Sequence, residues 1–222
     1  MADRSLLDRR RGVNAVGAAA SATTVGALPV YLVGALSVQI GRDLDLSSAA
    51  IGTIVATFWG TSALFSVAAG RFGDLVGVRT GLGLCAVLAS LSLMGTAVLG
   101  WSAWWLASTL AVAGVANAAA HPYSNMLLTQ AVPTRRRGLA FGIKQAAIPL
   151  ATLLAGLAVP ALAVTVGWRW AFVSAAVLAL LPLLMLRGVD RGRQHRRPMA
   201  SRRAHRPAPL PPCCADSCAS RL

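Results

Sequence analysis

Charge is scarce in this chain, and glutamate is missing altogether. Charged residues make up 13% of the 222 residues, and all seven acidic residues are aspartates, whereas soluble domains carry about 25% charged residues. The sequence also has no glycine-rich phosphate-binding loop, no paired-carboxylate site and no nucleophile elbow. These absences exclude an ordinary water-soluble enzyme, and we expect no enzymatic chemistry and no cofactor.

The basic residues outnumber the acidic ones but are unevenly placed. The 21 lysines and arginines give a formal net charge of +14, which at first suggests nucleic acid as a partner. They occur in short clusters between long uncharged stretches, whereas a nucleic-acid surface needs basic side chains spread over a folded face. With 56% hydrophobic residues and a mean hydropathy of +0.63, the pattern indicates a lipid bilayer as the partner and no nucleic acid.

Long uncharged stretches define the membrane-spanning segments, because ~20 apolar residues cross the hydrocarbon core. They are residues 12–41, 46–70, 80–134, 138–168 with Lys144 inside, and 170–186. The third is long enough for two helices, and its break is expected at 100–105, where glycine, serine and tryptophan favour an interfacial turn. We therefore predict an all-α integral membrane protein with six transmembrane helices, at 15–40, 48–70, 80–100, 103–130, 139–163 and 170–187.

The arginine clusters predict the orientation of these helices, because cytoplasmic loops keep the excess of Lys and Arg. Placing the N-terminus inside assigns the arginines of four segments to the cytoplasm: 1–14, 71–79, 135–137 and 187–193. Arg42 and Arg169 then lie outside, and six spans return both termini to the cytoplasmic side. We expect a multi-pass protein of the plasma membrane.

Three parts are expected along the chain. Residues 1–14 form a cytoplasmic N-terminal segment, 15–187 a six-helix transmembrane domain, and 188–222 a basic tail rich in proline and arginine. The tail lacks apolar periodicity, so we expect it to be disordered, and its abrupt change of composition suggests the non-native ending of a truncated chain. Its cysteines, Cys213, Cys214 and Cys218, lack a fourth ligand in ordered geometry for zinc, and no metal site is expected.

The turn between the second and third predicted helices carries glycine, aspartate and arginine in a defined spacing. Gly70, Asp74, Gly77 and Arg79 form the pattern Gly-x-x-x-Asp-x-x-Gly-x-Arg, which resembles the signature loop of the major facilitator superfamily. The chain departs from the family at two positions that usually hold basic residues. They are occupied here by Leu75 and Val78.

Other segments are also similar to this family, namely 46–52, 137–142 and 167–172, so the resemblance covers about residues 13–187. It implies half of a transporter, with six helices arranged as two inverted three-helix repeats. Gly77-Val78-Arg79 and Gly167-Trp168-Arg169 are a weak echo of that repeat. In the family, the loop between helices 2 and 3 is a cytoplasmic gating latch, which here comprises Gly70, Asp74, Gly77 and Arg79.

The resemblance further implies transport of a small solute by alternating access, in which two halves rock about a site near the membrane midplane. Because this chain contains one half, we expect it to be truncated or to need a second copy or a complementary half. The alternatives are a transport-incompetent fragment and a six-helix membrane scaffold protein that never transports.

Candidate binding residues come from the helices that line the cavity in this family, the first, second, fourth and fifth. Asn117, His121 and Asn125 recur every fourth residue and share one face of the fourth helix. The functional interpretation makes His121 a solute ligand or proton carrier, since its unperturbed pKa of ~6.5 suits that role. The alternative is hydrogen bonding between helices of this half, and the sequence does not choose between the two.

On the fifth helix, Lys144 and Gln145 are candidates for an anionic solute. Lys144 is the only lysine and lies ~10 Å deeper than Arg137 along a helix. The other interpretation, which the sequence slightly favours, is that its stem reaches back to the cytoplasmic interface. Weaker candidates on three helices are Ser21, Thr24, Tyr31, Thr53, Thr57, Gly60, Pro149, Thr152 and Gly156.

The sequence restricts how transport could be coupled to a proton gradient. None of the predicted spans contains an aspartate or glutamate, so the usual intramembrane carboxylate relay is absent from this half. Proton-driven antiporters of the family tend to carry an arginine where this chain has Leu110, and their Gly-Pro-x-x-Gly pattern is missing from the fifth helix. These differences disfavour a drug–proton antiporter and favour uniport or symport.

Overall fold

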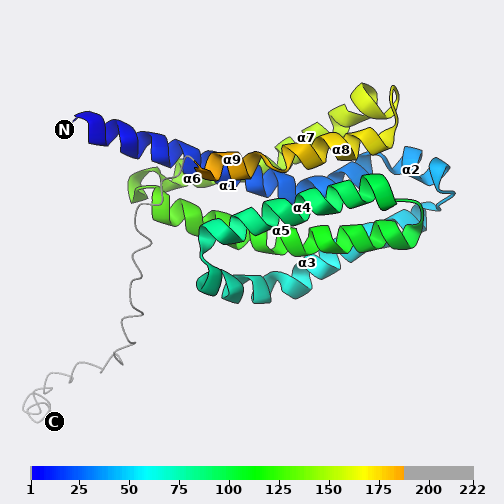
Figure 1. Cartoon of the computed structure of the whole chain (residues 1–222), viewed down its shortest axis with the longest axis horizontal. Helices are drawn as coiled ribbons and strands as arrows, with labels where there is room; N and C mark the ends of the chain where they lie inside the picture. The colour runs from blue at the N-terminus through cyan, green and yellow to red at the C-terminus, as the bar shows by residue number, and fades with distance from the viewer. Residues whose placement is uncertain (1, 188–222) are drawn as a thin grey trace, which may run out of the picture. The chain divides into compact units, whose positions relative to one another are not determined.

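The computed structural model describes residues 2–187, and within them the side chains of residues 12–72 and 75–187. This part of the chain is helical and contains no strand, which confirms the predicted all-α class (Figure 1). The elements are α1 (Ala2–Ala35), α2 (Ser37–Asp43), α3 (Ser48–Val76), α4 (Val78–Leu99), α5 (Ala103–Ala131), the 3-10 turn η1 (Thr134–Arg136), α6 (Arg137–Gln145), α7 (Ala147–Ala158), the π-helical turn η2 (Val159–Ala163), α8 (Trp168–Leu178) and α9 (Leu181–Arg187).

Six segments of residues 2–187 are long and apolar enough to cross a membrane, as predicted. They are Gly12–Ala35, Ser48–Phe72, Val78–Leu99, Ala103–Ala131, Thr134–Ala163 and Trp168–Arg187. We refer to them as helices 1 to 6. The start of α1 and the end of α9 lie at the same end of the bundle (Figure 1). Arg71, Arg79 and Arg135 lie at the helix ends on that side, whereas Arg42 and Arg169 lie at ends on the other.

The predicted loop between helices 2 and 3 is wrong in its extent. Residues 71–76 continue α3, and α4 begins at Val78, so that Gly77 alone separates the two helices. Residues 71–76 contain no proline, whereas Gly77 has a φ of 85°, a conformation that glycine adopts without a steric penalty. The first helix also differs from its predicted limits, since it ends at Ala35 and the short helix α2 follows.

Prolines explain why helices 5 and 6 are each interrupted. A proline removes the hydrogen bond to the carbonyl four residues earlier. Pro149 therefore frees the carbonyl of Gln145, where α6 ends, and Pro182 frees that of Leu178, where α8 ends. Pro122 behaves differently, because α5 runs through it without a break.

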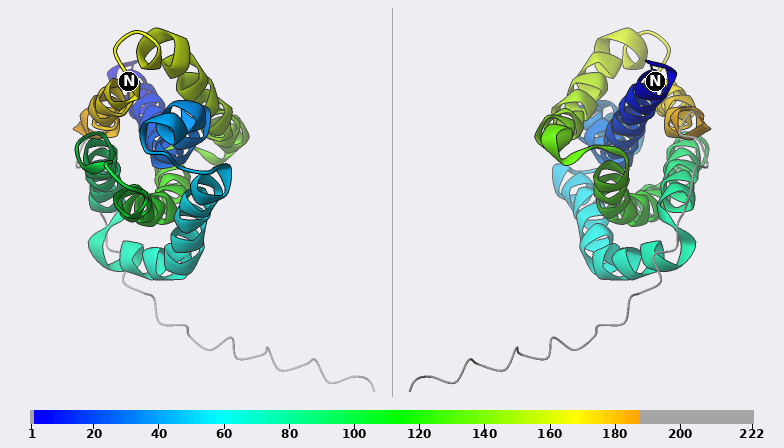
Figure 2. Two further views of the ribbon diagram at one scale, coloured as in Figure 1. Left: turned by 90° about the vertical axis from the view of Figure 1, so that its right-hand side faces the viewer. Right: turned by 90° about the vertical axis from the view of Figure 1, so that its left-hand side faces the viewer.

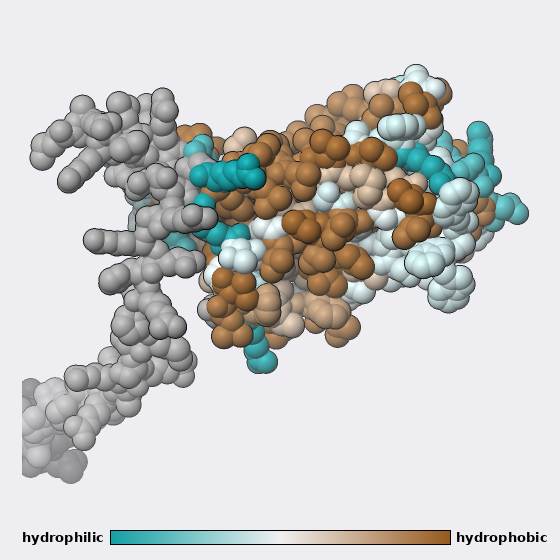
Figure 3. Space-filling model, viewed as in Figure 1, coloured by the Kyte–Doolittle hydropathy of each residue, from teal (hydrophilic) through white to brown (hydrophobic). Residues whose placement is uncertain are grey.

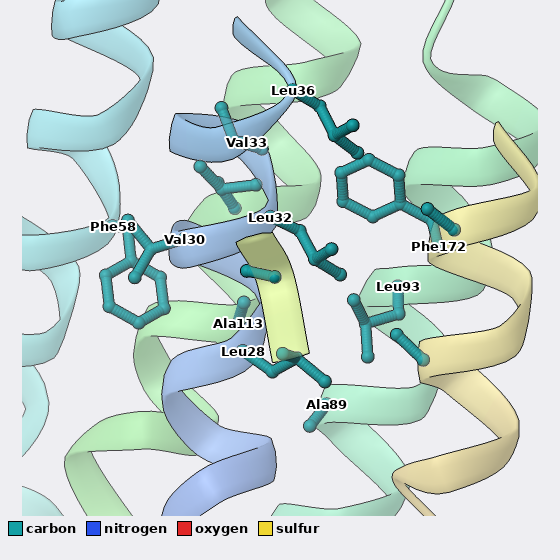
Figure 4. Close-up of a cluster of buried hydrophobic side chains, with 14 of the residues drawn as sticks. Leu28, Val30, Leu32, Val33, Leu36, Phe58, Ala89, Leu93, Ala113 and Phe172 are labelled. Atoms are coloured by element: carbon teal, nitrogen blue, oxygen red, sulfur yellow. The ribbon is translucent and has the colours of Figure 1, made fainter. Parts of the chain in front are cut away.

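Helix 1 lies near the middle of the bundle, as the end-on views of Figure 2 show. It contacts α3, α4, α5, α7, α8 and α9, and 72% of its most apolar segment is buried, the largest share of the six. Leu28 and Leu32 of α1, and Leu36 directly after it, pack into the main core with side chains from other helices, including Phe58, Leu93, Ala113 and Phe172 (Figure 4). This contact with every neighbouring helix makes α1 the axis of the fold.

The bundle carries an apolar surface. On the face shown in Figure 3, hydrophobic residues form a broad band, and polar residues gather toward the two ends of the helices. Large exposed side chains such as Leu64, Leu91 and Val177 contribute to this surface. So extensive an apolar surface marks a membrane or protein contact, in agreement with the six spans.

One of the contacts between the two three-helix repeats is an antiparallel pair, α4 with α8–α9. Arg79 at the start of α4 donates to the carbonyl of Leu186 at the end of α9. Arg169 at the start of α8 donates, at 3.5 Å, to the carbonyl of Ala97 at the end of α4. Each arginine follows a glycine of positive φ, Gly77 at 85° and Gly167 at 110°. The echo between the two Gly-x-Arg segments therefore corresponds to a reciprocal contact, which we call the clasp.

Candidate functional site

The predicted polar stripe of α5 is divided between two neighbouring helices. Asn117 turns toward α3, where its Nδ2 donates to Ser62 Oγ at 2.9 Å, and only 3% of the residue is exposed. His121 and Asn125 instead meet α6. The equal spacing along α5 therefore does not place the three side chains against one helix, and Asn117 makes a hydrogen bond to α3.

Lys144 joins His121 and Asn125 into one cluster. Its Nζ donates to Asn125 Oδ1 at 3.0 Å and lies 3.4 Å from His121 Nδ1. Only 4% of the lysine is exposed, so the side chain does not reach back to water as the sequence had slightly favoured. That expectation is wrong because two polar atoms on the facing helix, which the sequence does not place, receive the ammonium group inside the bundle.

The ammonium group also determines how its two partners are oriented. A lysine ammonium donates hydrogen bonds and accepts none, so the facing His121 Nδ1 and Asn125 Oδ1 act as acceptors. The proton of a neutral His121 is then on Nε2. What these partners still offer a solute is N–H, from His121 Nε2 and Asn125 Nδ2. We call Lys144, His121 and Asn125 the lysine cluster.

The lysine cluster places a cation in a region otherwise free of charge. The six spans contain no aspartate or glutamate, and Lys144 lies ~10 Å along the helix from its first residue, Arg137. A charged residue at the centre of a bilayer costs about 2.5–3.5 kcal/mol on insertion scales, and such residues face the bundle interior or a wet cavity. A hydrocarbon side chain at this position would avoid the cost, so the lysine cluster is a candidate functional site.

Gln145, the remaining predicted binding residue, lies beside the lysine cluster in sequence but is exposed. None of the hydrogen bonds that hold the cluster together involves it. It sits at the end of α6, directly before the break at Ala146. The structure therefore does not bring it together with Asn125 and His121.

A hollow of about 390 Å³ opens between helices 1, 2 and 5. Its lining includes Tyr31 and Gly34 from α1, Val55 and Trp59 from α3, and Thr152 and Gly156 from α7. Tyr31, Thr152 and Gly156 were among the weaker predictions, whereas Trp59 was missed. Nothing in the sequence distinguishes Trp59 from a lipid-facing tryptophan, since its role depends on how α3 is rotated about its axis.

Ser62 was also missed by the sequence analysis. It is a small hydroxyl residue in an apolar helix, which usually indicates close packing, and the sequence offers no signal that it bonds Asn117. Asn117 Oδ1 is buried without a partner among the described residues. The Asn117–Ser62 bond thus supplies the amide's one hydrogen bond across the contact of α3 and α5.

The predicted gating residues occupy the junction of α3 and α4. Gly70 and Asp74 lie within α3, and the Asp74 side chain is outside the described part of the chain. Tyr123 of α5 donates to the carbonyl of Ala69 at 2.9 Å, which fixes this end of α3. Gly77 makes the turn, and Arg79 forms one half of the clasp.

The sequence profile of the Major Facilitator Superfamily matches residues 14–213. The chain belongs to this superfamily. Members of the superfamily are transporters and not enzymes, and the six helices of this chain form half of the superfamily fold. The match includes residues 188–213, which lie outside the described part of the chain. The predictions that the tail is disordered and of non-native origin concern these same residues.

A curated relative is described as a quinolone resistance transporter of Acinetobacter baumannii. The two sequences are 30% identical over 163 residues, which represent 69% of this chain and 37% of the relative. The matched residues therefore cover well under half of the relative's length. The relative's name supports solute transport as the general activity of this family of membrane proteins.

Proposed function

We propose that this chain is the N-terminal half of a small-solute transporter of the plasma membrane. The observation that carries the proposal is the lysine cluster: the six spans hold one lysine and no carboxylate, and that lysine is buried against two polar side chains of another helix. Both termini of the half are proposed to be cytoplasmic, because the helix ends that carry Arg71, Arg79 and Arg135 share one side of the bundle.

The solute would bind on the side of the bundle that includes the hollow between α1, α3 and α7. Helices 2 and 5 border that side and are the least covered of the six, with 22% and 17% of their most apolar segments buried. A second half packed over these two helices would enclose the site, as alternating access requires. A complementary half and a second copy of the chain are the two partners to test.

The gating residues have a mechanical role in this proposal. Gly77 permits the abrupt reversal between α3 and α4, and Arg79 ties that reversal to the end of helix 6. Movement of α3 against a second half would thus be transmitted to helices 3 and 6 at one end. Neutralising Asp74, as Asp74→Asn, tests whether this segment acts as a latch: an active preparation with unchanged flux would show that it is a turn only.

Reconstitution tests transport directly. The full chain is placed in liposomes alone, and then together with the C-terminal half of the quinolone resistance transporter as a complementary half, and the uptake of radiolabelled solutes is measured. A quinolone is the first solute, because the curated relative is named for quinolone resistance. Flux with the complementary half supports the proposal, and flux from the chain alone, dependent on dimer formation, supports a second copy.

Two alternatives stand as outcomes of the same experiment. A transport-incompetent fragment or a non-transporting membrane scaffold would show no flux for any solute in either arrangement. The substitution Lys144→Gln tests the lysine cluster in the same experiment. Flux that does not change when the cluster is broken would show that the cluster is not the transport site. The Arg135→Gln variant loses one exposed charge and should keep its flux. It separates the effect of breaking the lysine cluster from a general loss of positive charge.

A further inference from the structure

The lysine cluster offers a solute hydrogen-bond donors and a positive charge. An ammonium has three N–H donors, and Asn125 Oδ1 and His121 Nδ1 accept two of them. Because both acceptors are taken, the polar hydrogens that remain belong to Lys144, to His121 Nε2 and to Asn125 Nδ2. A group that binds at this cluster must therefore accept hydrogen bonds.

Charge restricts the solute further. The six spans contain no acidic residue, so the bundle itself provides no carboxylate at this depth to neutralise Lys144. A solute with a negative charge would complete an ion pair, whereas a cationic solute would meet a like charge in a low-dielectric site. One lysine matches a single negative charge, and a doubly charged phosphate would leave one charge unmatched.

We propose that the solute carries a carboxylate, and that this carboxylate binds between Lys144, His121 and Asn125. This inference rests on the proposed transport function and names the chemical class of solute for the same site. Asn125 is exposed and His121 half-buried, so the carboxylate approaches from their side while Lys144 lies behind them. The charge of the solute, and not its shape, is then the first determinant of specificity.

Matched pairs of ligands test the inference by binding, without a need for transport. Benzoate is compared with benzamide, and a quinolone carboxylic acid with its primary amide, on the full purified chain in lipid nanodiscs by titration calorimetry. A charge-assisted hydrogen bond makes the acid bind about tenfold tighter than the amide, or more. Equal affinity within a pair, or no binding by either acid, would overturn the inference.

Variants then assign the preference to the lysine cluster. Lys144→Gln is expected to abolish the difference between acid and amide, whereas Lys144→Arg keeps the charge and retains part of it. Arg135→Gln is the matched control, since it removes one exposed positive charge at the helix end and is expected to leave the preference intact. A Lys144→Gln protein that still prefers the acid would contradict the proposal.

A measurement on the unmodified chain covers the case in which the variants fail to fold. Because Lys144 is the only lysine, an amine-reactive reagent labels one side chain, which mass spectrometry separates from the N-terminal amine. The acid is expected to slow labelling of Lys144, and the amide much less. Binding of the acid with no effect on the labelling rate would place the carboxylate elsewhere and refute the assignment.

The binding and transport experiments can fail separately. Selective binding of the acid without flux would remove the proposed transport activity and leave the carboxylate site standing. Flux with no preference for acids would remove the carboxylate site and leave the transport activity standing. The two claims are therefore tested by different measurements on the same preparation.

Discussion

The pair formed by α4 with α8–α9 and the pair formed by α3 with α6–α7 differ in how they are held. Along the first pair three hydrogen bonds cross between the helices: Arg79 to Leu186, Ser90 to Ala176, and Arg169 to Ala97. As the residue number rises along α4, that of its partner falls by nearly the same amount, so the pair is antiparallel and in register over its whole length. We call this pair the closed side.

The helices of the second pair, which we call the open side, depend on other helices. α3 is attached through α5, where Asn117 bonds Ser62, Tyr123 bonds Ala69, and the backbone of Gly114 lies against Phe58 and Thr61. α7 is attached through α1, with Thr24 Oγ1 donating to the carbonyl of Ala147 at 3.3 Å. Fixed helices on one side and sparsely covered helices on the other are what a half that rocks against a partner requires.

The largest expected effect comes from the contact that holds α3 to α5. A Cβ added at Gly114 would overlap Thr61 and the backbone carbonyl of Phe58, so Gly114→Ala is expected to destabilise the bundle by about 3 kcal/mol. Gly60→Ala is the matched control on α3, because its Cβ would meet nothing within 4 Å. Unfolding in mixed detergent micelles measures both, and equal stabilities would show that α3 is not held by this crossing.

Breaking the clasp should lower the free energy of unfolding by a smaller amount. Arg79→Gln loses a charge-assisted hydrogen bond, about 2 kcal/mol. Arg169→Gln loses a longer bond and the stacking of its guanidinium 4.5 Å from the Trp101 ring, together about 1 kcal/mol. The exposed control Arg135→Gln should stay within about 0.5 kcal/mol. Should both clasp variants match this control in unfolding experiments, the closed side would not be held at its ends.

A smaller effect is expected at the Asn117–Ser62 hydrogen bond of the open side. Ser62→Ala removes the acceptor of the Asn117 amide, and interhelical hydrogen bonds in membranes contribute about 0.6 kcal/mol on average and up to about 1.7. We expect the free energy of unfolding to fall by about 1 kcal/mol. Asn117 Oδ1 already has no partner among the described residues, so the substitution also removes the hydrogen bond of the amide nitrogen. Ser66→Ala, whose hydroxyl bonds its own helix at 2.7 Å, is the control. A larger loss at Ser66 than at Ser62 would contradict this assignment.

The last prediction concerns which side chains water can reach, and it does not involve stability. Thr152 of α7 lines the hollow on the open side, whereas Val177 of α8 is an exposed apolar residue beside the closed side. In a background without the native cysteines, Thr152→Cys should react with a membrane-impermeant thiol reagent and Val177→Cys should not, because lipid excludes the reagent. Equal labelling of the two cysteines would erase the distinction between a water-facing side and a lipid-facing side.

Much of the fold could be predicted because hydropathy acts at each position separately. Uncharged stretches identified all six spans, and Gly77 and Gly167 were recognised as equivalent positions before their positive φ values were known. The errors concern places where neighbouring residues decide. Residues 71–76 extend α3 instead of forming a loop, and the effect of a proline depended on its context, since Pro149 ends a helix and Pro122 does not.

The candidate site was predicted as a set of residue types but not as an arrangement. Asn117, His121 and Asn125 were identified on one face of α5, yet they serve two different contacts. Lys144 was expected to turn toward water because a long flexible stem allows this, and the sequence contains no information about what faces it. The acceptors that hold it are 19 and 23 residues away along the chain.

The sequence alone determined that the chain has six segments able to cross a membrane and that it belongs to a transporter family. The six spans follow from the exclusion of charge from lipid, which each segment obeys independently, and the family follows from the spacing of glycine, aspartate and arginine around residue 74. The tertiary structure decided that Lys144 lies against Asn125 and His121, and that one pair of helices is clasped while another remains open. Such pairings depend on the rotation and crossing of whole helices, since a shift of one residue turns a side chain by about 100° around its helix.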